Sequence, residues 1–539
     1  MIDIKNQYLG GGVKYLFMVD LPLLGNVYKS KLLSDLLENK KALADAHNGV
    51  NISSIDQAFL NKRDISIEKR KILHDSIEKQ YNSIDLALPK SLSTIKNQGT
   101  FTITTGHQLC LFGGPQYFIH KIISVISTAQ KLKKKFPNNI FLPVFWLASE
   151  DHDFKEISSL TIFNKKLGVE KEDSIAVGKL NPSIFKPILN ELKEIFKNEE
   201  SFNHLEYIFS KALEMPTWSQ ASRYWITHVF KIEDLIIIDA DDKSLKVLFK
   251  DSFHDELDQQ FIHQYVSVKN KELEFRGYQP KIDPRELNLF YLSNKKRQRI
   301  IYKNNSFLIG DQSFDKLQIL EKLNSSIEKF SPNVLLRPLY QESILPNLVY
   351  IGGPSEIAYW TQLKDAFDFQ SIPFPIVMLR DHFTWLSQKQ LDQWENLGLT
   401  INDLLKSPDE LIKSFLNKKH QNDLSLKDQE NQLIMIQDDL VKKASQIDQS
   451  LVPMVLGSIK SMLNGLNKIN QKFSQSLKRN EEQYIAQIRK INGAVIENGI
   501  LKERTENFIG PFLKYNGDYI EKLIKLSSVE SNSLKVLIY

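Results

Sequence analysis

The feature that most constrains the fold is a nearly continuous apolar run, IFLPVFWLA, at residues 140–148, which ends abruptly in the polar block at residues 149–153. A strand that is apolar on both faces belongs in a parallel sheet with helices on both sides. Similar strand-like runs, separated by stretches with helical spacing, lie at residues 101–105, 235–239, 334–339, 349–353 and 375–380. We therefore expect an α/β protein with a Rossmann-like parallel sheet as its core.

The order of these patterns predicts six consecutive segments. The α/β pattern is interrupted once, and a long region with only helical spacing follows it. The predicted segments are a helical lead-in (1–95), the first half of the core (96–242), an inserted connecting segment (243–330), the second half of the core (331–385), a helical coiled-coil domain (386–505) and a C-terminal tail that packs back on the core (506–539).

The region after residue 386 has the apolar spacing of long paired helices. Apolar residues recur mostly by threes and fours from Leu433 to Met454 and again from Met462 to Val495, which predicts a coiled-coil seam. Pro453 lies near the middle, and a proline costs about 3 kcal/mol inside a helix. We therefore expect an antiparallel hairpin that turns near residues 450–453. An arm of roughly 45 residues would extend about 65–70 Å, long enough to embrace a second subunit.

Charge and apolar content exclude several classes of protein. The chain has 539 residues, with 70 Lys and Arg against 65 Asp and Glu and a formal net charge of +5, which argues against a protein that tracks along nucleic acid. The N-terminus lacks the apolar core of a signal peptide, and no run of 18 apolar residues occurs. We therefore expect a cytoplasmic protein without a membrane partner. The single cysteine, Cys110, excludes an internal disulfide and a cysteine-based metal cluster.

Three polar or glycine-containing loops follow predicted strands, where ligands bind in open parallel sheets. The first loop joins the strand at 101–105 to a helical stretch at 117–135. Its glycines permit close approach of the backbone, and the helix start offers free N–H groups to an anion. The alternative is a tight strand-to-helix turn without a ligand. The candidate site residues of this loop are Thr105, Gly106, His107, Gln108, Gly113 and Gly114.

The second loop, Ser149-Glu150-Asp151-His152-Asp153, places three carboxylates and an imidazole directly after a buried strand. Burying charge is costly unless the charge serves a ligand or a cation, so we predict that this loop belongs to a site. His152 could transfer a proton or bind phosphate. Alternatively, Asp151 or Asp153 only caps the next helix. A zinc site shared with the first loop lacks the His-x3-His spacing, so we predict no tightly bound metal and only Mg²⁺ delivered with a nucleotide.

The third loop, at residues 352–356, has the same arrangement of glycines before a helix as the first loop. Its glycines precede a helix predicted at 355–367, so backbone N–H groups could hold a carboxylate or a phosphate, while Glu356 could receive an amine. Arg337 and Gln341, at and after the strand predicted at 334–339, would lie at the same edge of a doubly wound sheet. Taken singly, each is expected more often as a salt bridge or cap than as a ligand contact. The candidates here are Gly352, Gly353, Ser355, Glu356, Tyr359 and Trp360.

Two residues near the first loop have chemistry of their own. His120 lies inside the following helical stretch and is expected to be a packed core histidine. Cys110 lies within the loop and invites a nucleophile hypothesis, but the sequence gives it no histidine of known geometry.

Longer blocks around the three loops resemble the BshC family, the cysteine ligases of bacillithiol biosynthesis. These blocks are TGHQLCLFGGP at 105–115, PVFWLASEDHDF at 143–154 and GGPSEIAYW at 352–360. Residues 235–242, 337–339 and 501–504 and the coiled-coil hairpin also fall in the family's order, so the similarity spans nearly the whole chain. It implies a Rossmann-like core split by connecting-peptide inserts, similar to class I aminoacyl-tRNA synthetases, and a coiled coil that forms a homodimer.

The resemblance also implies an activity, which is the addition of L-cysteine to the amine of glucosaminyl-malate in the last step of bacillithiol biosynthesis. A carboxylate is a poor electrophile, so it must be activated; ATP could supply an acyl-adenylate or an acyl-phosphate, and the family binds ADP. His107 would stabilise phosphates and act in catalysis with Asp151 and His152. The acidic block at 150–153 would bind the amines of cysteine or glucosamine, and arginine or lysine side chains would bind the malyl carboxylates.

Two other functions stay open on the sequence. A related ATP-dependent ligase could join a different amino acid to an amine, because the core pattern does not encode the thiol. Alternatively, the coiled coil could be the working part, which would make the chain an assembly scaffold with a non-catalytic core.

Overall fold

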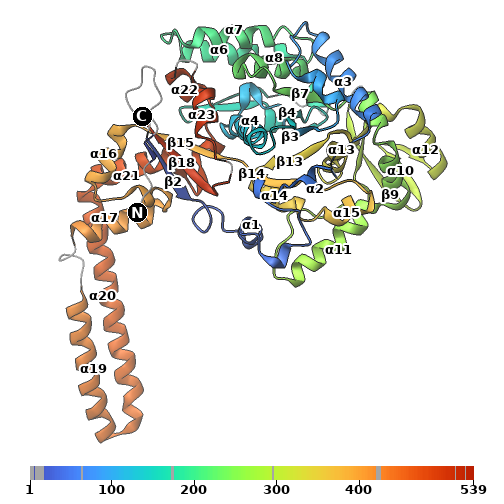
Figure 1. The fold of residues 1–539 in the computed structure, drawn as a ribbon. Helices are drawn as coiled ribbons and strands as arrows, with labels where there is room; N and C mark the ends of the chain where they lie inside the picture. Colours follow the sequence, from blue (N-terminus) through green and yellow to red (C-terminus); the bar gives the residue numbers. More distant parts are fainter. Residues whose placement is uncertain are drawn as a thin grey trace.

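A five-stranded parallel sheet with the order β14-β13-β3-β4-β7 forms the centre of the computed structural model (Figure 1). The structure describes residues 5–6, 17–61, 63, 65–170, 175–293, 296–420, 426–515, 518–528 and 530–539. The central strands are β3 (Thr100–His107), β4 (Ile140–Leu147), β7 (Ile236–Asp239), β13 (Asn347–Gly352) and β14 (Ile376–Leu379). All four pairings are parallel. The Rossmann-like parallel sheet predicted from the apolar runs is therefore confirmed.

The chain builds this sheet in two directions. It runs from β3 through β4 to β7 on one side and then returns to place β13 and β14 on the other side of β3. Ligands of open parallel sheets bind outside the carboxyl ends of the strands at the point where the winding reverses. Here that point lies between β3 and β13, so the ends of these two strands, at His107 and Gly352, mark the expected crevice.

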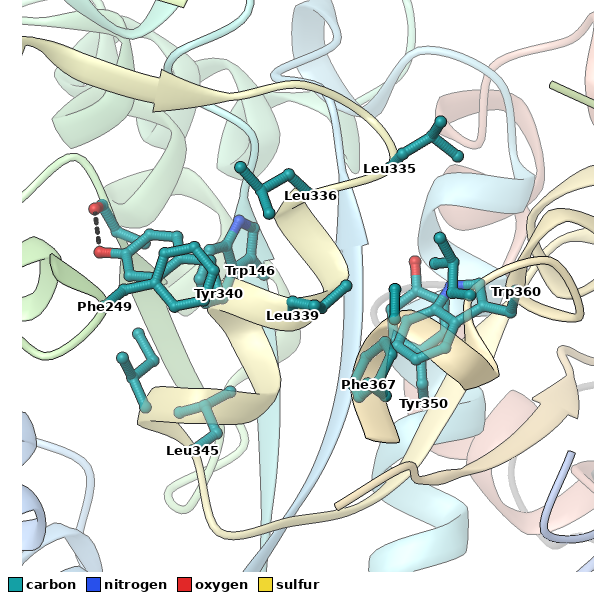
Figure 2. Close-up of a cluster of buried hydrophobic side chains, with 14 of the residues drawn as sticks. Trp146, Phe249, Leu335, Leu336, Leu339, Tyr340, Leu345, Tyr350, Trp360 and Phe367 are labelled. Atoms are coloured by element: carbon teal, nitrogen blue, oxygen red, sulfur yellow. Dashed lines mark hydrogen bonds between the residues drawn. The ribbon is translucent and has the colours of Figure 1, made fainter. Parts of the chain in front are cut away.

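Helices cover both faces of the sheet. On one face α4 (Tyr117–Lys135) packs against β3 and β4, and most of its residues are buried. Figure 2 shows apolar packing around α13 and α14: Trp146 lies edge-on to Tyr340 with ring centroids 5.5 Å apart, and Tyr350 stacks on Trp360 at 4.5 Å. The further helices around the sheet are α3 (Ile67–Asn82), α8 (Trp218–Phe230), α13 (Arg337–Ile344), α14 (Pro354–Trp360) and α15 (Lys364–Phe369).

The segments between the core strands carry smaller elements. Before the core lie β1 (Lys5–Asn6), β2 (Phe17–Pro22), α1 (Lys31–Leu37) and α2 (Gln57–Asn61). Between β4 and β7 lie α5 (Phe154–Ile157), β5 (Ser159–Ile162), β6 (Lys165–Gly168), α6 (Lys186–Ile195) and α7 (Phe202–Ala212). Between β7 and β13 lie α9 (Lys243–Val247), α10 (Lys250–Gln259), α11 (Phe261–Phe275), α12 (Lys316–Ser325) and a second sheet of β8 (Leu289–Leu292), β9 (Arg297–Lys303), β10 (Ser306–Ile309), β11 (Gln312–Phe314) and β12 (Phe330–Pro332).

The prediction of a strand at residues 334–339 is wrong, because α13 begins inside this run. Pro338 lies in the first turn of the helix, where proline is well tolerated because the N–H groups of that turn have no helical partner. The Asn333 side chain accepts hydrogen bonds from the N–H groups two and three residues later, which fixes the turn before the helix. The run is apolar because the helix is buried, not because it is a strand.

A four-stranded sheet, in the order β1-β2-β18-β15, joins the two ends of the chain. β18 (Ser533–Ile538) pairs antiparallel with β2 and parallel with β15 (His382–Leu386), and all six of its residues are buried. The sequence pattern predicts only helix before residue 95 and no strand after 386, so β2 and β18 correct both expectations. Figure 1 shows this sheet between the core and the helical arm.

The coiled-coil hairpin projects away from the rest of the molecule in Figure 1. α19 (Lys427–Ile447) and α20 (Val452–Asn480) pack against each other. Pro453 lies in the first turn of α20, which confirms the predicted turn. No helix in the described ranges is both long and apolar enough to span a bilayer. Around the base of the arm and after it lie α16 (Gln388–Asn396), α17 (Pro408–Lys419), α21 (Glu482–Gly493), β16 (Ile496–Glu497), β17 (Ile500–Leu501), α22 (Ile509–Lys514) and α23 (Tyr519–Leu526).

Candidate active site

A cavity of about 590 Å³ lies at the carboxyl ends of the central strands. Its walls come from the segments that follow β3, β4, β7, β13 and β14, from α4 and α13, from the inserted segment and from the turn after the arm. We call this cavity the cleft. The charged residues that line it are Lys121, Glu150, Asp151, Glu156, Asp241, Asp283, Arg285, Arg297, Arg337, Glu356, Arg380 and Arg504.

Lys121 and Glu356 form an ion pair at the point where the sheet reverses direction. Lys121 Nζ lies 2.5 Å from Glu356 Oε2 and donates to Gly106 O at 2.8 Å. Glu356 also accepts from the Tyr350 hydroxyl at 2.8 Å and from Gly353 N at 2.7 Å. Burial by itself would raise the pKa of Glu356, but Lys121 lowers it to about 2. Glu356 is therefore ionised and occupied by protein partners, which argues against its predicted role of receiving a substrate amine.

Arg337 lies on the neighbouring wall, held from behind by Gln341. Its Nη1 donates to Gln341 Oε1 at 2.9 Å, and its guanidinium lies 6.0 Å from the Trp146 ring and 5.7 Å from the Tyr350 ring. Gln341 Nε2 in turn donates to Glu342 Oε1 at 2.8 Å. The carboxylate thus fixes which end of the Gln341 amide faces Arg337. Gln341 therefore supports the cleft from outside its wall, while Arg337 lines it.

His107 is a neutral imidazole in the wall of the cleft. Its ring lies edge-on to Tyr117 and Phe118, at 5.1 and 5.3 Å between centroids, and its Nδ1 donates to Gln108 O at 3.0 Å. Burial, assisted by Lys121, lowers the pKa of His107 to about 3. At physiological pH the ring can offer hydrogen bonds but no positive charge. A role for His107 at phosphates is thereby limited to hydrogen bonding.

Asp151 of the second loop is held by partners from three parts of the chain. Its Oδ1 accepts from His152 N at 2.7 Å and lies 3.5 Å from Arg297 Nη1, and its Oδ2 accepts from Gln108 Nε2 at 2.7 Å. Burial would raise the pKa of Asp151, but His152 and Arg297 hold it well below its usual value. Arg297 belongs to β9 of the inserted segment, where it lies 3.9 Å from the Phe290 ring centroid. The insert therefore supplies one wall of the cleft.

The rest of the second loop is bound to buried partners. Glu150 Oε1 and Asp241 Oδ1 each lie 2.7 Å from Lys246 Nζ, and the Lys246 side chain is fully buried. Burial raises the pKa of Glu150, against the opposing effect of Lys246. The Ser149 hydroxyl donates to Asp239 at the end of β7. These contacts tie the ends of β4 and β7 together, so the loop is a rigid wall.

The charges of the cleft are separated along the sheet. The cations Lys121, Arg337, Arg380 and Arg504 gather where β3, β13 and β14 end, with Glu356 as their acidic neighbour. The carboxylates Glu150, Asp151, Glu156 and Asp241 gather where β4 and β7 end, with Arg297 as their cationic neighbour. The cleft therefore has a cationic side and an acidic side.

Gly113 and Gly114 of the first loop do not open to the cleft, although Tyr117 at the start of α4 lines it. Asn507 Nδ2 donates to Phe112 O at 3.0 Å and to Gly114 O at 2.6 Å. A Cβ atom on Gly113 would lie 2.9 Å from the Phe508 ring. The segment after the arm thus covers Gly113 and Gly114, which argues against a ligand contact at these two glycines. The glycines serve the close approach of two parts of the chain.

Several other predicted site residues serve the fold and do not line the cleft. The Thr105 hydroxyl donates to the backbone of β13 at 2.7 Å. Asp153 caps α5, as the capping alternative predicts. Trp360 is fully buried in the core, and Gly352 is the last residue of β13.

The remaining predicted residues are brought together by the fold. Those that line the cleft are Gly106, His107, Gln108, Ser149, Glu150, Asp151, His152, Arg337, Gly353, Ser355, Glu356 and Tyr359. Lys121 was missed, although a lysine on an otherwise apolar helix face is a signal for a buried charge. Arg380, directly after β14, follows the same strand-end rule as the predicted loops. Arg297 and Arg504 carry no local signal, because only the tertiary fold brings them to the cleft.

The acids and histidines of the cleft do not form a metal cluster in the described ranges. The one grouping of ligand atoms close enough for an ion there is His74, Asp75 and Glu78 on α3, outside the cleft.

Two family models match the chain. The one described as the N-terminal Rossmann-like domain of BshC in bacillithiol biosynthesis matches residues 21–381, and the one described as its C-terminal coiled-coil domain matches residues 383–539.

Relatives over nearly the full length agree with these matches. A Flavobacterium johnsoniae protein named "Putative cysteine ligase BshC" is 33% identical over 513 residues, which cover 94% of this chain and 97% of the relative. A protein of the same name from Christiangramia forsetii is 33% identical and covers 95% and 97%. A solved structure described as an arginyl-tRNA synthetase of Campylobacter jejuni aligns over 87% of this chain and 99% of its own, with 9% identity and a TM-score of 0.21. That likeness is too weak to bear on the fold, so the similarity to class I synthetases stays a prediction. The chain belongs to the BshC family, the cysteine ligases of bacillithiol biosynthesis.

Proposed function

We propose that this chain adds L-cysteine to the amine of glucosaminyl-malate, the last step of bacillithiol biosynthesis. The observation that carries the proposal is the separation of charge in the cleft. Glucosaminyl-malate has two carboxylates on its malyl group and an amine on its sugar. A cleft with a cationic side and an acidic side, joined by a rigid floor of strand ends, suits a molecule of this polarity.

On the cationic side, the guanidinium groups of Arg337 and Arg504 bind the malyl carboxylates, together with Nε of Arg380, whose two Nη atoms are already bonded to Glu503. Guanidinium groups match carboxylates because two parallel N–H donors can face two oxygens. On the acidic side, Asp151 holds the ammonium of the second substrate or of the sugar. Its lowered pKa keeps it ionised and makes it a poor proton acceptor. Asp151 therefore orients an amine and does not deprotonate it.

The amine must lose a proton before it attacks a carbonyl carbon. Two groups on the acidic side can accept this proton: His152, whose imidazole is partly exposed on the wall, and Glu156, whose pKa is raised by burial. A carboxyl with a raised pKa beside one with a lowered pKa divides the roles of proton acceptor and fixed charge. We assign the first role to His152 or Glu156 and the second to Asp151.

Activation of the cysteine carboxyl requires ATP in this proposal. ATP supplies the leaving group that turns the carboxylate into an electrophile. Arg297, on the acidic side, and Arg285, which the insert also brings to the cleft, are the residues that would hold its phosphates, and Mg²⁺ would arrive with the nucleotide. Neither glycine loop is free for this purpose. One is covered by the segment after the arm, and Gly353 N is bonded to Glu356.

We also propose that the arm forms a homodimer. Apolar side chains on α19 and α20 are exposed in the single chain although the two helices already pack on each other. Exposed apolar residues at helical spacing are typical of a surface that pairs with another helix. The exposed residues are Ile434, Met435, Ile436, Leu440, Ile447, Met454, Leu456, Met462, Ile469 and Phe473.

A reaction with purified protein tests the ligase proposal. The chain is incubated with ATP, Mg²⁺, L-cysteine and glucosaminyl-malate, and products are followed by mass spectrometry. The expected product has the mass of the two substrates less one water, and it forms together with ATP consumption. Replacing cysteine by a panel of amino acids tests the related ligase with another substrate. Equal or better use of another amino acid would overturn the assignment of cysteine.

A further inference from the structure

Glu503 is a buried carboxylate to which the proposed chemistry gives no task. It lies in the turn that follows the arm, and its side chain is fully buried. Its Oε1 accepts from Arg380 Nη2 at 2.7 Å and its Oε2 from Arg380 Nη1 at 3.1 Å. Two imidazoles complete the set, with His382 Nδ1 2.6 Å from Oε1 and His120 Nδ1 2.8 Å from Oε2. We call these four residues the Glu503 cluster.

The Glu503 cluster contains one negative and one positive charge. Burial by itself would raise the pKa of Glu503, but Arg380 and His382 hold it well below its usual value. Burial lowers the pKa of His382 to about 4 and also lowers that of His120. Both rings are therefore neutral hydrogen-bond donors at physiological pH. The negative charge of Glu503 is balanced by Arg380 alone.

Arg380 connects the cluster to the cleft. Its backbone N donates to Gly352 O at the end of β13, and its guanidinium lies 5.1 Å from the Tyr117 ring centroid. The side chain is buried and Nη1 also donates to Asp381 O at 2.8 Å, whereas Nε has no hydrogen-bond partner among the described residues. Arg504, the chain neighbour of Glu503, lies 5.4 Å from the same ring, and both arginines line the cleft. The turn after the arm thus holds one guanidinium of the cationic side and supplies a second.

We propose that Glu503 is a positioning residue, which fixes Arg380 through a two-pronged ion pair so that Nε of Arg380 and the guanidinium of Arg504 together bind the carboxylates of a dicarboxylate substrate. Two parallel hydrogen bonds define the plane of a guanidinium, which a long arginine side chain does not define by itself. The inference rests on the function proposed above, in which the dicarboxylate is glucosaminyl-malate. It makes the turn after the arm a working part of the cleft.

One substitution distinguishes a positioning role of Glu503 from a purely electrostatic one, because the two roles predict opposite changes in substrate binding. Glu503→Gln removes a negative charge behind the cationic side, so electrostatics alone would tighten the binding of a dianion. If Glu503 positions Arg380, binding instead weakens, because the amide holds the guanidinium less firmly. We expect the dissociation constant for glucosaminyl-malate, measured by calorimetry on the full-length chain, to rise at least tenfold.

Glu506→Gln is the matched control. Glu506 lies three residues further along and makes the same change of charge when substituted, but it accepts from Phe163 N at 3.1 Å and Asn164 N at 2.8 Å, away from the cleft. It should change the dissociation constant less than twofold. The dimethyl ester of the malyl group, which lacks both charges, is the second control. Glu503→Gln should leave its binding within twofold of the unsubstituted chain.

Each outcome decides the inference. Unchanged or tighter binding of glucosaminyl-malate by Glu503→Gln overturns it, and so does an equal loss for the diester, which would indicate general damage to the fold. If Glu503→Gln does not fold by circular dichroism, Glu503→Asp, which keeps the charge but withdraws the oxygens from Arg380, carries the test with the same tenfold criterion. Failure of the unsubstituted chain to bind glucosaminyl-malate would instead count against the proposed function.

Discussion

The cleft and the helical arm use their side chains in opposite ways. In the cleft, ionised groups are paired with each other, as the buried Lys121 is with the partly buried Glu356. On the arm, apolar groups such as Met435 and Met454 are exposed, with 70% and 62% of their surface accessible. Paired buried charge fixes a geometry at the cost of desolvation, whereas exposed apolar surface is stabilised only when a partner covers it. The difference indicates that the cleft is already organised in one chain, while the arm is completed by association.

The largest expected effect is the loss of a buried charge in the cleft. Lys121→Met leaves the partly buried carboxylate of Glu356 without its ammonium partner, which should lower the free energy of unfolding by about 3 kcal/mol and abolish ligation. Urea unfolding followed by circular dichroism measures the first effect. Lys134→Met, at the exposed end of the same helix, is the control and should cost less than about 0.5 kcal/mol. A Lys121→Met variant as stable as the control would show that the cleft is not organised by this pair.

The second prediction concerns the pH dependence of stability. The pKa of His107 is about 3 in the folded chain and about 6.5 when unfolded, so the unfolded chain takes up the proton first as pH falls. The stability linked to His107 is therefore complete above about pH 6.5 and is lost progressively between about pH 6.5 and 3. At up to about 1.4 kcal/mol per pH unit, the loss from pH 6.5 to 4.5 is roughly 2–3 kcal/mol.

Urea unfolding at several pH values measures this slope. His107→Gln should remove that part of the slope, whereas His254→Gln, at an exposed histidine, should leave it unchanged. Equal slopes in the native chain and in His107→Gln would contradict the burial of a neutral ring.

Substitutions on the exposed apolar surface of the arm should weaken association of the dimer and leave the folding of each chain unchanged. Met435→Glu with Met462→Glu places charges on its exposed apolar surface, so the dissociation constant of the dimer should rise at least about 30-fold, or about 2 kcal/mol. Sedimentation velocity measures the change, and the melting temperature of the core should stay the same. A chain that is monomeric without the substitutions would refute the proposed dimer.

The smallest expected effect is at Cys110, which the cleft does not use. Its Sγ lies 3.6 Å from His107 Nδ1, and burial raises the pKa of the thiol to about 12, so it is not a nucleophilic thiolate at neutral pH. Cys110→Ala should cost about 1 kcal/mol of stability and leave the ligation rate within twofold. A tenfold loss of rate in a folded variant would restore the nucleophile hypothesis.

The sequence could predict the features that depend on neighbouring residues, but not those that depend on contacts between distant parts of the chain. The five core strands and the loops after them are visible because a parallel strand is a local apolar run and its ligand loop follows at once. The pairing of β2 with β18 is not visible, since it joins residues 17–22 to residues 533–538. The meeting of Arg380 with Glu503 is hidden for the same reason, because nothing near either residue in the sequence marks the other.

In the reverse case, a pattern in the sequence suggests a ligand site but serves the fold. Asp153 and Gly114 look like ligand residues in the sequence, yet one caps a helix and the other accepts a hydrogen bond from Asn507 through its carbonyl. Both belong to loops that do form the cleft. Sequence reasoning therefore locates the site to within a loop, and the tertiary contacts decide which side chains of that loop face it.

The most direct test of the account compares the cleft and the arm in cells. Bacillithiol and glucosaminyl-malate are measured by mass spectrometry in a bacillithiol-producing strain whose own BshC gene is deleted, complemented with this chain or with its Asp151→Asn, His152→Asn double variant. The account predicts that the native chain restores bacillithiol, while the double variant, present at the same level, leaves glucosaminyl-malate to accumulate. Full restoration by the double variant would contradict it and would favour a scaffold whose working part is the arm.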